Sequence, residues 1–338
     1  MATSHQPPHF PAGKPKVVVT RHLMPSVEAR MSELFETVLN PDDIPLRQDQ
    51  LVAAMRDCDV LVPTVTDKIT EEIIEAAGDR LGLIASFGAG TEHIDLATAA
   101  ERKILVTNTP GVFTDDTADI AMAAIIGVPR RIREGTQLVR RDEWTGWAPS
   151  GLLGRKLGGK VLGIVGMGRI GQAVAHRARA FGLEIAYTNR KRLPEAVESM
   201  LSARFVEEVD ALVAQSDILT LHCPLTPETR GLMDARRIAL MKPGASLINT
   251  ARGELIDQDA LIEALHYGDL GGAGLDVYPD EPNVARGLLD HPNVMTLPHI
   301  GSATAEGRED SGEKVIAYIR FWADGHRPPD QVLTALIN

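Results

Sequence analysis

The six residues that decide the fold of this chain are Gly166-Met167-Gly168-Arg169-Ile170-Gly171. This G-x-G-x-x-G run follows an apolar stretch, 161–165, and opens a segment with helical periodicity, which is the context in which such a run binds a dinucleotide. In isolation the same run can be an ordinary turn. Here Gly166 allows a tight turn after a strand, Gly168 lets the backbone approach a pyrophosphate, and Gly171 permits close packing of helix on strand. The phosphates would then lie at the helix N-terminus.

Short β-branched runs alternate with helical segments along the chain. In the helix after the fingerprint, Val174 and Ala178 share one face, and Gly182 is placed to end it. Continuous apolar strands separated by helices are typical of parallel sheets covered on both faces. We therefore expect an α/β fold with two doubly wound parallel-sheet domains, of Rossmann or flavodoxin type, and a cleft between them. The expected strands are 17–19, 60–62, 83–85, 104–106, 161–165, 184–187, 218–221, 245–248, 274–277 and 294–297.

The two series of strands divide the chain into two domains. The parts expected are a disordered tail (1–15), a substrate-binding domain (16–111 plus 299–338) and a dinucleotide-binding Rossmann domain (112–298). A long helix from about residue 116 to 141 is expected to cross between the domains. Pro129 should kink that helix, because its ring clashes with a carbonyl one turn earlier. A last helix, 312–323, is expected to pack back on the first domain.

The composition is that of an acidic, fully folding protein. The chain has 338 residues, 44% of them hydrophobic and 24% charged, with a formal net charge of −11. At roughly 150 residues per domain, this length indicates about two domains. The negative charge disfavours nucleic acid and anionic membranes as partners, since both need a basic face. No apolar stretch approaches the roughly 20 residues that span a bilayer, and the N-terminus lacks a signal-peptide core. We expect a cytoplasmic protein.

The two cysteines, Cys58 and Cys223, are each flanked by strand-like sequence. This pattern favours neither a disulfide framework nor a thiolate metal site. Both are expected to be small buried hydrophobic residues. His93 is expected to lie exposed in a loop. Because no cluster of His, Cys, Asp or Glu shows ligand spacing, no metal is expected.

The residues after the second strand of the dinucleotide unit bear on the choice of cofactor. NAD-binding versions of the fingerprint place an acidic residue about 20 positions onward to hold the ribose 2′-hydroxyl. At that place this chain has Asn189-Arg190-Lys191-Arg192. An acid would repel a 2′-phosphate, whereas a polar and basic cluster can hold one through charge-assisted hydrogen bonds. We therefore expect NADPH to be preferred, with NADH possible. The alternative is that Lys191 and Arg192 form only a solvated surface run.

Three side chains suited to carbonyl chemistry follow the fingerprint. Arg252 follows an expected strand, at the carboxyl edge where ligands bind in open parallel sheets, and its planar guanidinium can engage a carboxylate and the adjacent carbonyl oxygen. His299 follows the last strand, and histidine is the natural proton donor near neutral pH. A carboxylate such as Glu281 on its second nitrogen would orient the ring. Each residue alone has an ordinary structural explanation. Together with the fingerprint they indicate hydride transfer from a nicotinamide to a small keto acid.

Several further motifs stand in fixed order along the chain. They are Ser86-Phe87-Gly88-Ala89-Gly90-Thr91, Asn108-Thr109-Pro110-Gly111-Val112, His222-Cys223-Pro224-Leu225-Thr226, Asn249-Thr250-Ala251-Arg252-Gly253, Gly274-Leu275-Asp276-Val277-Tyr278 and Pro298-His299-Ile300-Gly301-Ser302. With the fingerprint, this order resembles the D-isomer-specific 2-hydroxyacid dehydrogenases, and within them the glyoxylate/hydroxypyruvate reductases. The likeness covers nearly the whole chain, from about Lys16 onward.

The resemblance implies roles for individual residues. His299 would be the proton donor and Glu281 its partner, while Arg252 would bind and polarise the substrate. Backbone amides of Ala89 and Gly90 would hold the substrate carboxylate. The cofactor contacts implied, together with the basic loop, are Gly166, Gly168, Arg169, Ile170, Gly171, Thr117, Asn189, Arg190, Lys191, Cys223, Pro224, Thr250, Ala251, Asp276 and Gly301.

The resemblance also bears on the substrate pocket and on assembly. Phe87 would help to set the size of the pocket. Trp147 is similar to a tryptophan that some relatives insert into the active site of the partner subunit, and a homodimer is implied. Glu281 favours carbonyl reduction, because formate dehydrogenases of this family carry glutamine as the partner of the histidine.

The reaction implied is the NADPH-preferring reduction of glyoxylate or hydroxypyruvate to glycolate or D-glycerate. One alternative is an NAD-dependent dehydrogenase for a bulkier 2-hydroxy acid, against which the missing ribose acid counts. A second is a non-catalytic dinucleotide sensor, since the fold also serves as a corepressor scaffold. The intact set of Arg252, Glu281 and His299 counts against that alternative.

Overall fold

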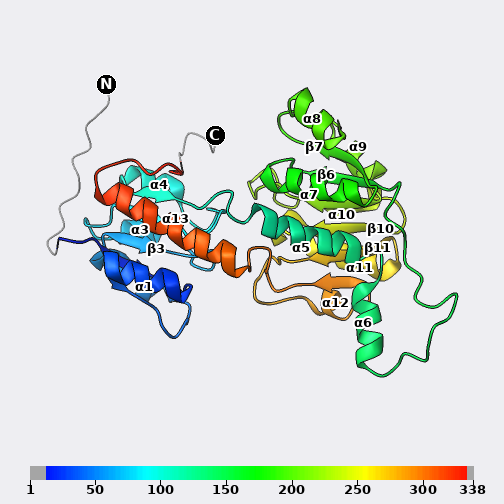
Figure 1. Cartoon of the computed structure of the whole chain (residues 1–338), viewed down its shortest axis with the longest axis horizontal. Coiled ribbons are helices and arrows are strands. Elements are labelled where there is room, and N and C mark those ends of the chain that lie inside the picture. Colours follow the sequence, from blue (N-terminus) through cyan, green and yellow to red (C-terminus); the bar gives the residue numbers. More distant parts are fainter. Residues whose placement is uncertain (1–12, 333–338) are drawn as a thin grey trace. The chain divides into compact units, whose positions relative to one another are not determined.

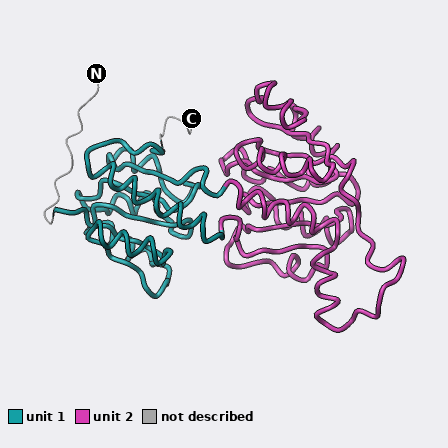
Figure 2. The backbone as a smooth tube through the Cα atoms, viewed as in Figure 1, with its two compact units in different colours: residues 1–113, 303–338 teal, residues 114–302 magenta. Residues whose placement is uncertain are grey.

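A computed structural model describes residues 13–332 of the chain. The chain folds as two compact units, shown in Figure 2: unit 1 is Met1–Phe113 with Ala303–Asn338, and unit 2 is Thr114–Ser302. Each unit contains one sheet, and every pairing between its strands is parallel. The predicted fold class, two α/β units with parallel sheets, is therefore confirmed. The expected tail at residues 1–15 lies almost wholly outside the described residues.

Unit 1 contains a five-stranded sheet in the order β2-β1-β3-β4-β5. Its strands are β1 (Lys16–Val19), β2 (Glu36–Val38), β3 (Val60–Val62), β4 (Leu83–Ala85) and β5 (Leu105–Thr107). Its helices are α1 (Pro25–Leu34), α2 (Gln48–Asp57), α3 (Glu71–Glu75), α4 (Leu96–Glu101) and α13 (Ala305–Ala323). The predicted return of the C-terminal helix is confirmed, since α13 packs on α1 and on β4.

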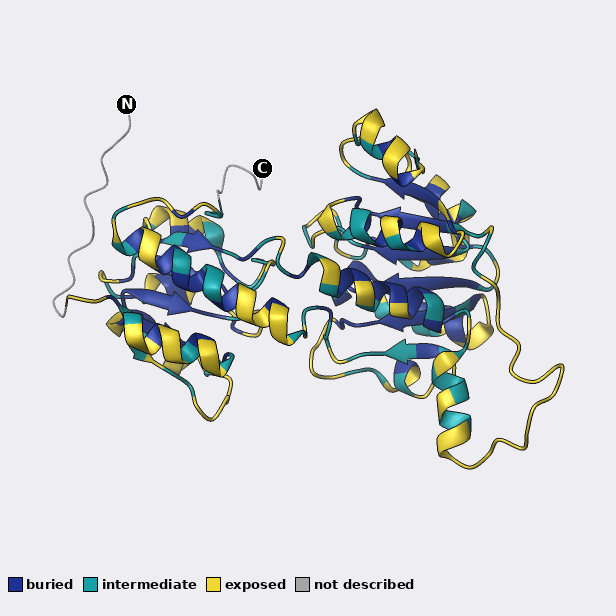
Figure 3. Ribbon diagram, viewed as in Figure 1, coloured by how far each residue is buried: buried dark blue, intermediate teal, exposed yellow. Residues whose placement is uncertain are grey.

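The side chains of unit 1 explain why helices cover both faces of its sheet. Alternate residues of a strand point to opposite faces, and both sets are apolar here. Leu61 and Ile84 pack with side chains of α2, α3 and α4, whereas Val60 and Leu83 pack with α1 and α13. Figure 3 shows the resulting layers, with dark blue strands between helices whose outer faces are yellow.

Unit 2 contains a seven-stranded sheet in the order β12-β11-β10-β9-β6-β7-β8. Its strands are β6 (Val161–Val165), β7 (Glu184–Thr188), β8 (Ala203–Phe205), β9 (Ile218–Leu221), β10 (Ala245–Asn249), β11 (Leu270–Leu275) and β12 (Val294–Thr296). Its helices are α5 (Thr114–Gly127), α6 (Ile132–Arg140), α7 (Arg169–Ala180), α8 (Glu195–Leu201), α9 (Val209–Gln215), α10 (Ala235–Leu240), η1 (Gly253–Leu255), α11 (Gln258–Tyr267) and α12 (Arg286–Leu289).

One face of the unit 2 sheet carries α5 and α7, which lie side by side in Figure 1. Arg177 of α7 ties the two helices together through Asp115 at 2.8 Å and Asp119 at 2.7 Å. The opposite face packs against α9, α10 and α11. The sheet is thus buried on both sides, as its continuous apolar strands predict.

The expected long helix over 116–141 is broken rather than kinked. Helix α5 ends at Gly127 and α6 begins at Ile132, with Pro129 between them and Arg131 in the left-handed region at φ 53°. Pro129 has no N–H for a helical hydrogen bond, which agrees with a full stop at this point. The expectation that this helix crosses between domains is wrong, because α5 starts at the first residue of unit 2.

The chain passes from unit 2 back to unit 1 after His299, not before it. The sequence predicts a boundary at 298/299, but the compact units divide between Ser302 and Ala303. Local hydrogen bonds give the reason: the amides of Ile300 and Gly301 donate to the Asp276 carboxylate, and Thr117 Oγ1 donates to the Gly301 carbonyl. These bonds fix the segment after β12 to unit 2.

His93 is not the exposed loop residue that its sequence context predicts. It is half-buried, and its Nε2 lies 3.3 Å from Ser86 Oγ. Burial lowers the pKa of its imidazole to about 4.

Cys58 is fully buried, as expected, whereas Cys223 is only half-buried; both are free thiols. Within residues 13–332, no helix is long and apolar enough to cross a membrane.

Candidate active site

The fingerprint forms the turn between β6 and α7. Gly166 has φ +94°, a conformation that disfavours side chains, and a Cβ there would lie 2.6 Å from the amide nitrogen of Cys223. A Cβ on Gly171 would lie 2.3 Å from the Gly166 carbonyl oxygen, so the helix can pack this closely only on a glycine. Beside Gly168, in contrast, nothing lies within 4 Å of the Cβ position. The three glycines thus have the geometry that the fingerprint predicts.

The N-terminus of α7 fits a dinucleotide pyrophosphate. The helix begins at Arg169 with Gly168 as its N-cap, which has no side chain to accept from the first-turn amides. Open space beside Gly168 gives a phosphate access to these amides, and the helix dipole favours an anion there. Arg169 is exposed and Ile170 half-buried at this end. Also in unit 2, Thr250 is buried, and its Oγ1 has no hydrogen-bond partner among the described residues. These features suit a nicotinamide dinucleotide.

The loop after β7 places two cations at the surface. Arg190 and Lys191 are exposed, and Asn189 Nδ2 donates to the Lys191 carbonyl oxygen at 3.2 Å. Arg192, which is part of the same basic run in the sequence, has a different partner, because it forms a bidentate ion pair with Glu198. The basic cluster therefore offers two cationic side chains to a ligand.

Asn249 organises the segment that carries Arg252. This asparagine ends β10 and is fully buried. Its Nδ2 donates to the Arg252 carbonyl at 2.7 Å, and its Oδ1 accepts from the Ala251 amide at 3.0 Å. The next residue, Gly253, lies so close to Tyr278 that a Cβ there would be 2.1 Å from the Tyr278 carbonyl carbon. The arginine loop and the Tyr278 loop are therefore packed together without a side chain between them.

Arg252 is half-buried, and its charge lies near carboxylates. Burial lowers the pKa of its guanidinium, while Glu254 and Glu281 act to raise it. Its Nη1 donates to the Ala251 carbonyl at 2.6 Å. A guanidinium in this setting remains charged.

Glu281 and His299 form the side-chain pair that the sequence predicts. The distance from His299 Nδ1 to Glu281 Oε2 is 2.7 Å, and Glu281 Oε1 accepts from the Tyr278 amide at 3.0 Å. Burial alone would raise the pKa of Glu281, but its bonds to His299 and Tyr278 and the charge of Arg252 together lower it. Glu281 is therefore an ionised carboxylate that fixes the imidazole ring through Nδ1 and leaves Nε2 outside this pair.

The backbone of His299 adopts an unusual conformation. Its φ is 53°, in the left-handed region that residues with side chains rarely occupy. Asp276, which is buried, holds it there by accepting from the Ile300 amide at 2.8 Å and the Gly301 amide at 2.7 Å. Burial raises the pKa of Asp276, and the two amides act against that shift. Residues with side chains in the left-handed region cluster at functional sites.

Tyr278 joins the ends of the two strands that lead to this pair. Its hydroxyl lies 3.1 Å from the Leu275 carbonyl oxygen and 2.9 Å from that of Leu297. Burial raises the pKa of its phenol to about 12, so it stays protonated. Sequence reasoning missed the positioning roles of Asn249 and Tyr278, although both belong to motifs quoted above.

The remaining cofactor residues also lie in unit 2. Cys223 and Pro224 follow β9, and the Cys223 amide faces the fingerprint turn at Gly166. Burial raises the pKa of the Cys223 thiol to about 11. Thr117, on α5, is tied to the Gly301 carbonyl at 3.0 Å. Unit 2 thus carries all the cofactor residues that the resemblance implies.

The implied carboxylate-binding residues lie in unit 1, after β4. The Phe87 amide donates to the Pro63 carbonyl at 2.8 Å, and Asn108 Nδ2 donates to the Ala89 carbonyl at 2.6 Å. Ala89 is exposed, while Phe87 and Gly90 are half-buried. The ends of β3 and β5 therefore hold this loop in place.

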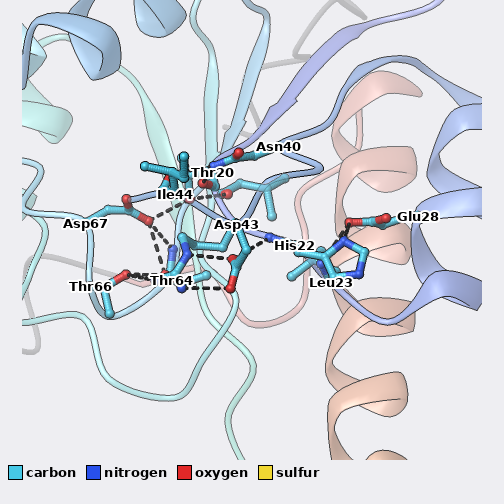
Figure 4. A network of polar contacts seen from close by, with 12 residues as sticks. Thr20, His22, Leu23, Glu28, Asn40, Asp43, Ile44, Thr64, Thr66 and Asp67 are labelled. Carbon is cyan, nitrogen blue, oxygen red and sulfur yellow. Dashed lines mark hydrogen bonds and ion pairs between the residues drawn. The ribbon is translucent and has the colours of Figure 1, made fainter. Parts of the chain in front are cut away.

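A polar network that sequence reasoning missed supports the neighbouring strand ends of unit 1. Asp67, which is buried, accepts from Thr20 Oγ1 at 2.6 Å and from the Thr64 amide at 2.8 Å. Figure 4 shows Asp67 with Thr20 and Thr64, and Asp43 close to them. Arg21 pairs with Asp43 at 2.8 Å. These side chains join the ends of β1 and β3, where the strand order of this sheet reverses. Ligands of open α/β sheets bind at such a point.

Comparisons with known proteins agree with this geometry. The family model of the D-isomer specific 2-hydroxyacid dehydrogenase NAD-binding domain matches residues 122–301. Glyoxylate reductase of Thermococcus litoralis is 44% identical over 323 residues, which cover 94% of this chain and 97% of that protein. The chain belongs to the D-isomer specific 2-hydroxyacid dehydrogenase family. It is an NAD(P)-dependent oxidoreductase of 2-hydroxy acids, whose reverse reaction reduces 2-keto acids.

Two other members of this dehydrogenase family bear on its chemistry. Glycerate dehydrogenase of Hyphomicrobium methylovorum is 37% identical over 297 residues, covering 88% of this chain and 92% of that protein. The NADPH-dependent glyoxylate/hydroxypyruvate reductase of Sinorhizobium meliloti, solved with NADP and malonate, superposes with a TM-score of 0.85 at 32% identity. The match covers 94% of this chain and 97% of that structure.

Proposed function

We propose that this dehydrogenase reduces glyoxylate and hydroxypyruvate, prefers NADPH, and uses His299 as the proton donor. The observation that carries the proposal is the 2.7 Å bond between His299 and Glu281, in the same unit as the fingerprint turn. The names of the glyoxylate reductase and glycerate dehydrogenase relatives support the choice of substrates.

The proton has a defined route in this proposal. When bound, NADPH would supply the hydride that reduces the carbonyl carbon of the keto acid. His299 Nε2 gives its proton to the carbonyl oxygen, so that the C=O bond becomes a CH–OH group. Glu281, on the other ring nitrogen, holds the imidazole in one orientation and stabilises its protonated form. Solvent then returns a proton to His299.

Arg252 is the second side chain that acts on the keto acid in this proposal. Its guanidinium is delocalised and planar, so it can bridge the carboxylate and the carbonyl oxygen of a 2-keto acid. The positive charge of the guanidinium stabilises the negative charge that develops on the carbonyl oxygen during reduction. We propose that the backbone amides of Ala89 and Gly90 hold the substrate carboxylate, with Phe87 beside it.

The cofactor preference rests on the loop after β7. Arg190 and Lys191 are exposed there. The loop has no acidic residue at the position where NAD-binding versions carry the ligand of the ribose 2′-hydroxyl. Two cations can bind a 2′-phosphate through charge-assisted hydrogen bonds. The NADP-bound relative from Sinorhizobium meliloti supports this preference.

We further propose that the protein is a homodimer whose interface includes α6 and the segment that follows it. Residues 141–153 are exposed, and Trp147 is 85% exposed. Large exposed apolar side chains that gather on one segment indicate an interaction site. Those exposed here are Ile132, Val139, Trp144, Trp147, Leu152 and Leu153.

The test is the steady-state oxidation of NADPH and NADH in parallel, with glyoxylate, hydroxypyruvate and pyruvate as separate substrates. Rapid oxidation of NADPH with glyoxylate or hydroxypyruvate is expected. Turnover with NADH alone would refute the cofactor preference and keep the reductase. If neither cofactor is oxidised with any keto acid, the non-catalytic sensor becomes the better explanation.

A further inference from the structure

The loop after β7 is anchored by a buried cluster that the proposed chemistry does not use. The Glu198 carboxylate, at 8% side-chain exposure, lies at its centre. The Tyr187 hydroxyl donates to Glu198 Oε1 at 2.7 Å. Arg192 donates from Nε to the same oxygen at 2.9 Å and from Nη2 to Oε2 at 2.7 Å. Both oxygens of Glu198 are thus occupied by side chains that flank the loop.

This cluster closes the loop at its C-terminal end. The Leu193 amide donates to the Tyr187 hydroxyl at 2.9 Å, so the phenol both donates to Glu198 and accepts from the backbone. At the N-terminal end, the Gly166 amide donates to the Thr188 carbonyl at 3.0 Å. Residues 189–192 are therefore held between the fingerprint turn on one side and the Tyr187–Glu198 pair on the other.

The same contacts sort the loop cations into two groups. The charge of Arg192 is compensated by Glu198, and its guanidinium lies 5.7 Å from the centre of the Phe205 ring. The pKa of Glu198 is lowered to about 2, chiefly by the bond from Arg192 and next by that from Tyr187, so the pair stays ionised. Arg190 and Lys191 are exposed and, in the part of the chain that the structure describes, donate no side-chain hydrogen bond.

We propose that Glu198 is a positioning residue that sets the preference for NADPH over NADH. It acts through Tyr187 and Arg192, which hold the loop so that Arg190 and Lys191 face a 2′-phosphate. This inference rests on the proposed NADPH preference. A loop whose backbone is fixed before binding saves the entropy that a mobile backbone would otherwise lose when it is ordered. A ligand that lacks the 2′-phosphate does not use these cations and gains nothing from the anchoring.

Two effects oppose each other when Glu198 is changed. Glu198→Gln weakens the anchor, which lowers affinity for the 2′-phosphate, but it also removes a negative charge close to that phosphate. Solvent and salt screen the second effect, because the loop is exposed. Tyr187→Phe separates the two effects, since it removes the bonds to Glu198 and Leu193 without changing any charge.

The experiment is isothermal titration calorimetry with two adenosine ligands, adenosine 2′,5′-bisphosphate and 5′-AMP. Both occupy the adenosine end of the site, and only the first carries the 2′-phosphate. The purified full-length proteins are the wild type, Tyr187→Phe, Glu198→Gln and Asp210→Asn. The last is a matched control, because Asp210 is likewise a carboxylate paired with arginine, here Arg236 and Arg237, on another part of unit 2.

We expect the wild type and Asp210→Asn to bind the bisphosphate more tightly than 5′-AMP, with equal preference. In Tyr187→Phe and Glu198→Gln the preference should fall about tenfold, as the loss of one charge-assisted hydrogen bond predicts. Binding of 5′-AMP should stay within about twofold of the wild type. If a substitution at buried Tyr187 or Glu198 prevents folding, Arg192→Gln is a third variant. It should keep the fold, because the Arg192 side chain is 63% exposed.

The outcomes separate the two proposals. If the wild type does not prefer the bisphosphate, the proposed NADPH preference is wrong. If the wild type prefers it and the variants keep that preference within about twofold, the preference stands and the role of Glu198 is refuted. Equal losses for both ligands would also refute that role, because they would show a general structural effect.

Discussion

At the scale of single residues, the chemistry depends on a carboxylate that stays ionised beside an imidazole. Glu281 meets this requirement because His299, the Tyr278 amide and Arg252 outweigh the effect of burial on its pKa. The sequence predicts this pair from strand ends and residue types. It does not predict that Asp276 fixes the left-handed backbone of His299, since that role depends on two amides 24 and 25 residues away.

Replacing the Glu281 charge tests the role of the pair. Glu281→Gln keeps an oxygen for the His299 ring but removes the charge that stabilises its protonated form. We expect kcat for keto acid reduction to fall about 100-fold, within the usual range for general acid catalysis, while the Kd of NADPH changes little. Glu263→Gln, on the exposed face of α11, is the control and should retain full kcat. A Glu281→Gln enzyme with wild-type kcat would show that the charge is dispensable.

The Glu198 cluster also predicts a dependence of stability on pH. The folded pKa of Glu198, about 2, lies below the ordinary value of 4.5. Its stabilising effect is therefore fully present above about pH 4.5 and is lost as the pH falls towards 2. We expect Glu198→Gln to be less stable than the wild type at pH 7, with the difference shrinking below pH 4.5. Urea denaturation at pH 7, 5 and 3.5 measures it, and a difference that grows at low pH would contradict this sign.

At the scale of elements, four inner strands have the predicted bounds, whereas two of the four edge strands are missed. Strands β3, β4, β6 and β9 have the predicted bounds, because each is mostly buried and, apart from Thr220 in β9, contains no polar side chain. The sequence does not predict β2 and β8, which are edge strands with partly exposed residues and hence little apolar pattern.

Strand β11 differs from its prediction, since the sequence indicates a strand at 274–277 and the structure has one at Leu270–Leu275. Its glycines weaken the strand pattern in the sequence, yet close packing requires them. A Cβ on Gly271 would lie 2.3 Å from the Gly244 carbonyl oxygen, and one on Gly274 would lie 2.8 Å from Ala124 Cβ. Such contacts come from distant parts of the chain, so the local sequence cannot reveal them.

The β6–α7 turn gives a prediction that contrasts two of its glycines. Gly168→Ala adds a methyl group to open space, so we expect thermal stability near that of the wild type but a loss of NADPH affinity of about tenfold or more, because the methyl occupies the phosphate approach. Gly171→Ala drives a methyl against the Gly166 carbonyl, so stability itself should fall. Thermal unfolding and NADPH titration measure both effects. Unchanged NADPH affinity in a folded Gly168→Ala protein would exclude the phosphate from this turn.

At the scale of the whole molecule, the exposed segment after α6 predicts self-association. Light scattering should give a mass twice that of the 36.5 kDa chain. If Trp147 enters the partner's active site, Trp147→Ala should keep the dimer mass and raise the KM for hydroxypyruvate more than the KM for NADPH. Tyr267→Ala, at another exposed aromatic residue of unit 2, is the control. A monomeric wild type would refute the proposed assembly.

The two-unit architecture is predictable because strands and helices alternate along the whole chain. Each unit has its own core, and the catalytic pair and the fingerprint both belong to unit 2. The boundary after β12 cannot be placed from the sequence, because hydrogen bonds of Asp276 and Thr117 decide it. Those bonds keep His299 with the cofactor residues.

The central claim, that His299 protonates the substrate carbonyl, is tested most directly by kcat for NADPH oxidation with glyoxylate in the wild type and in His299→Gln. Glutamine keeps a polar side chain but cannot supply the proton. The account predicts rapid turnover by the wild type and a kcat about 10²- to 10⁴-fold lower in the variant, with NADPH binding retained by titration. A His299→Gln enzyme that keeps wild-type kcat, or a wild type that leaves NADPH unoxidised, would contradict it.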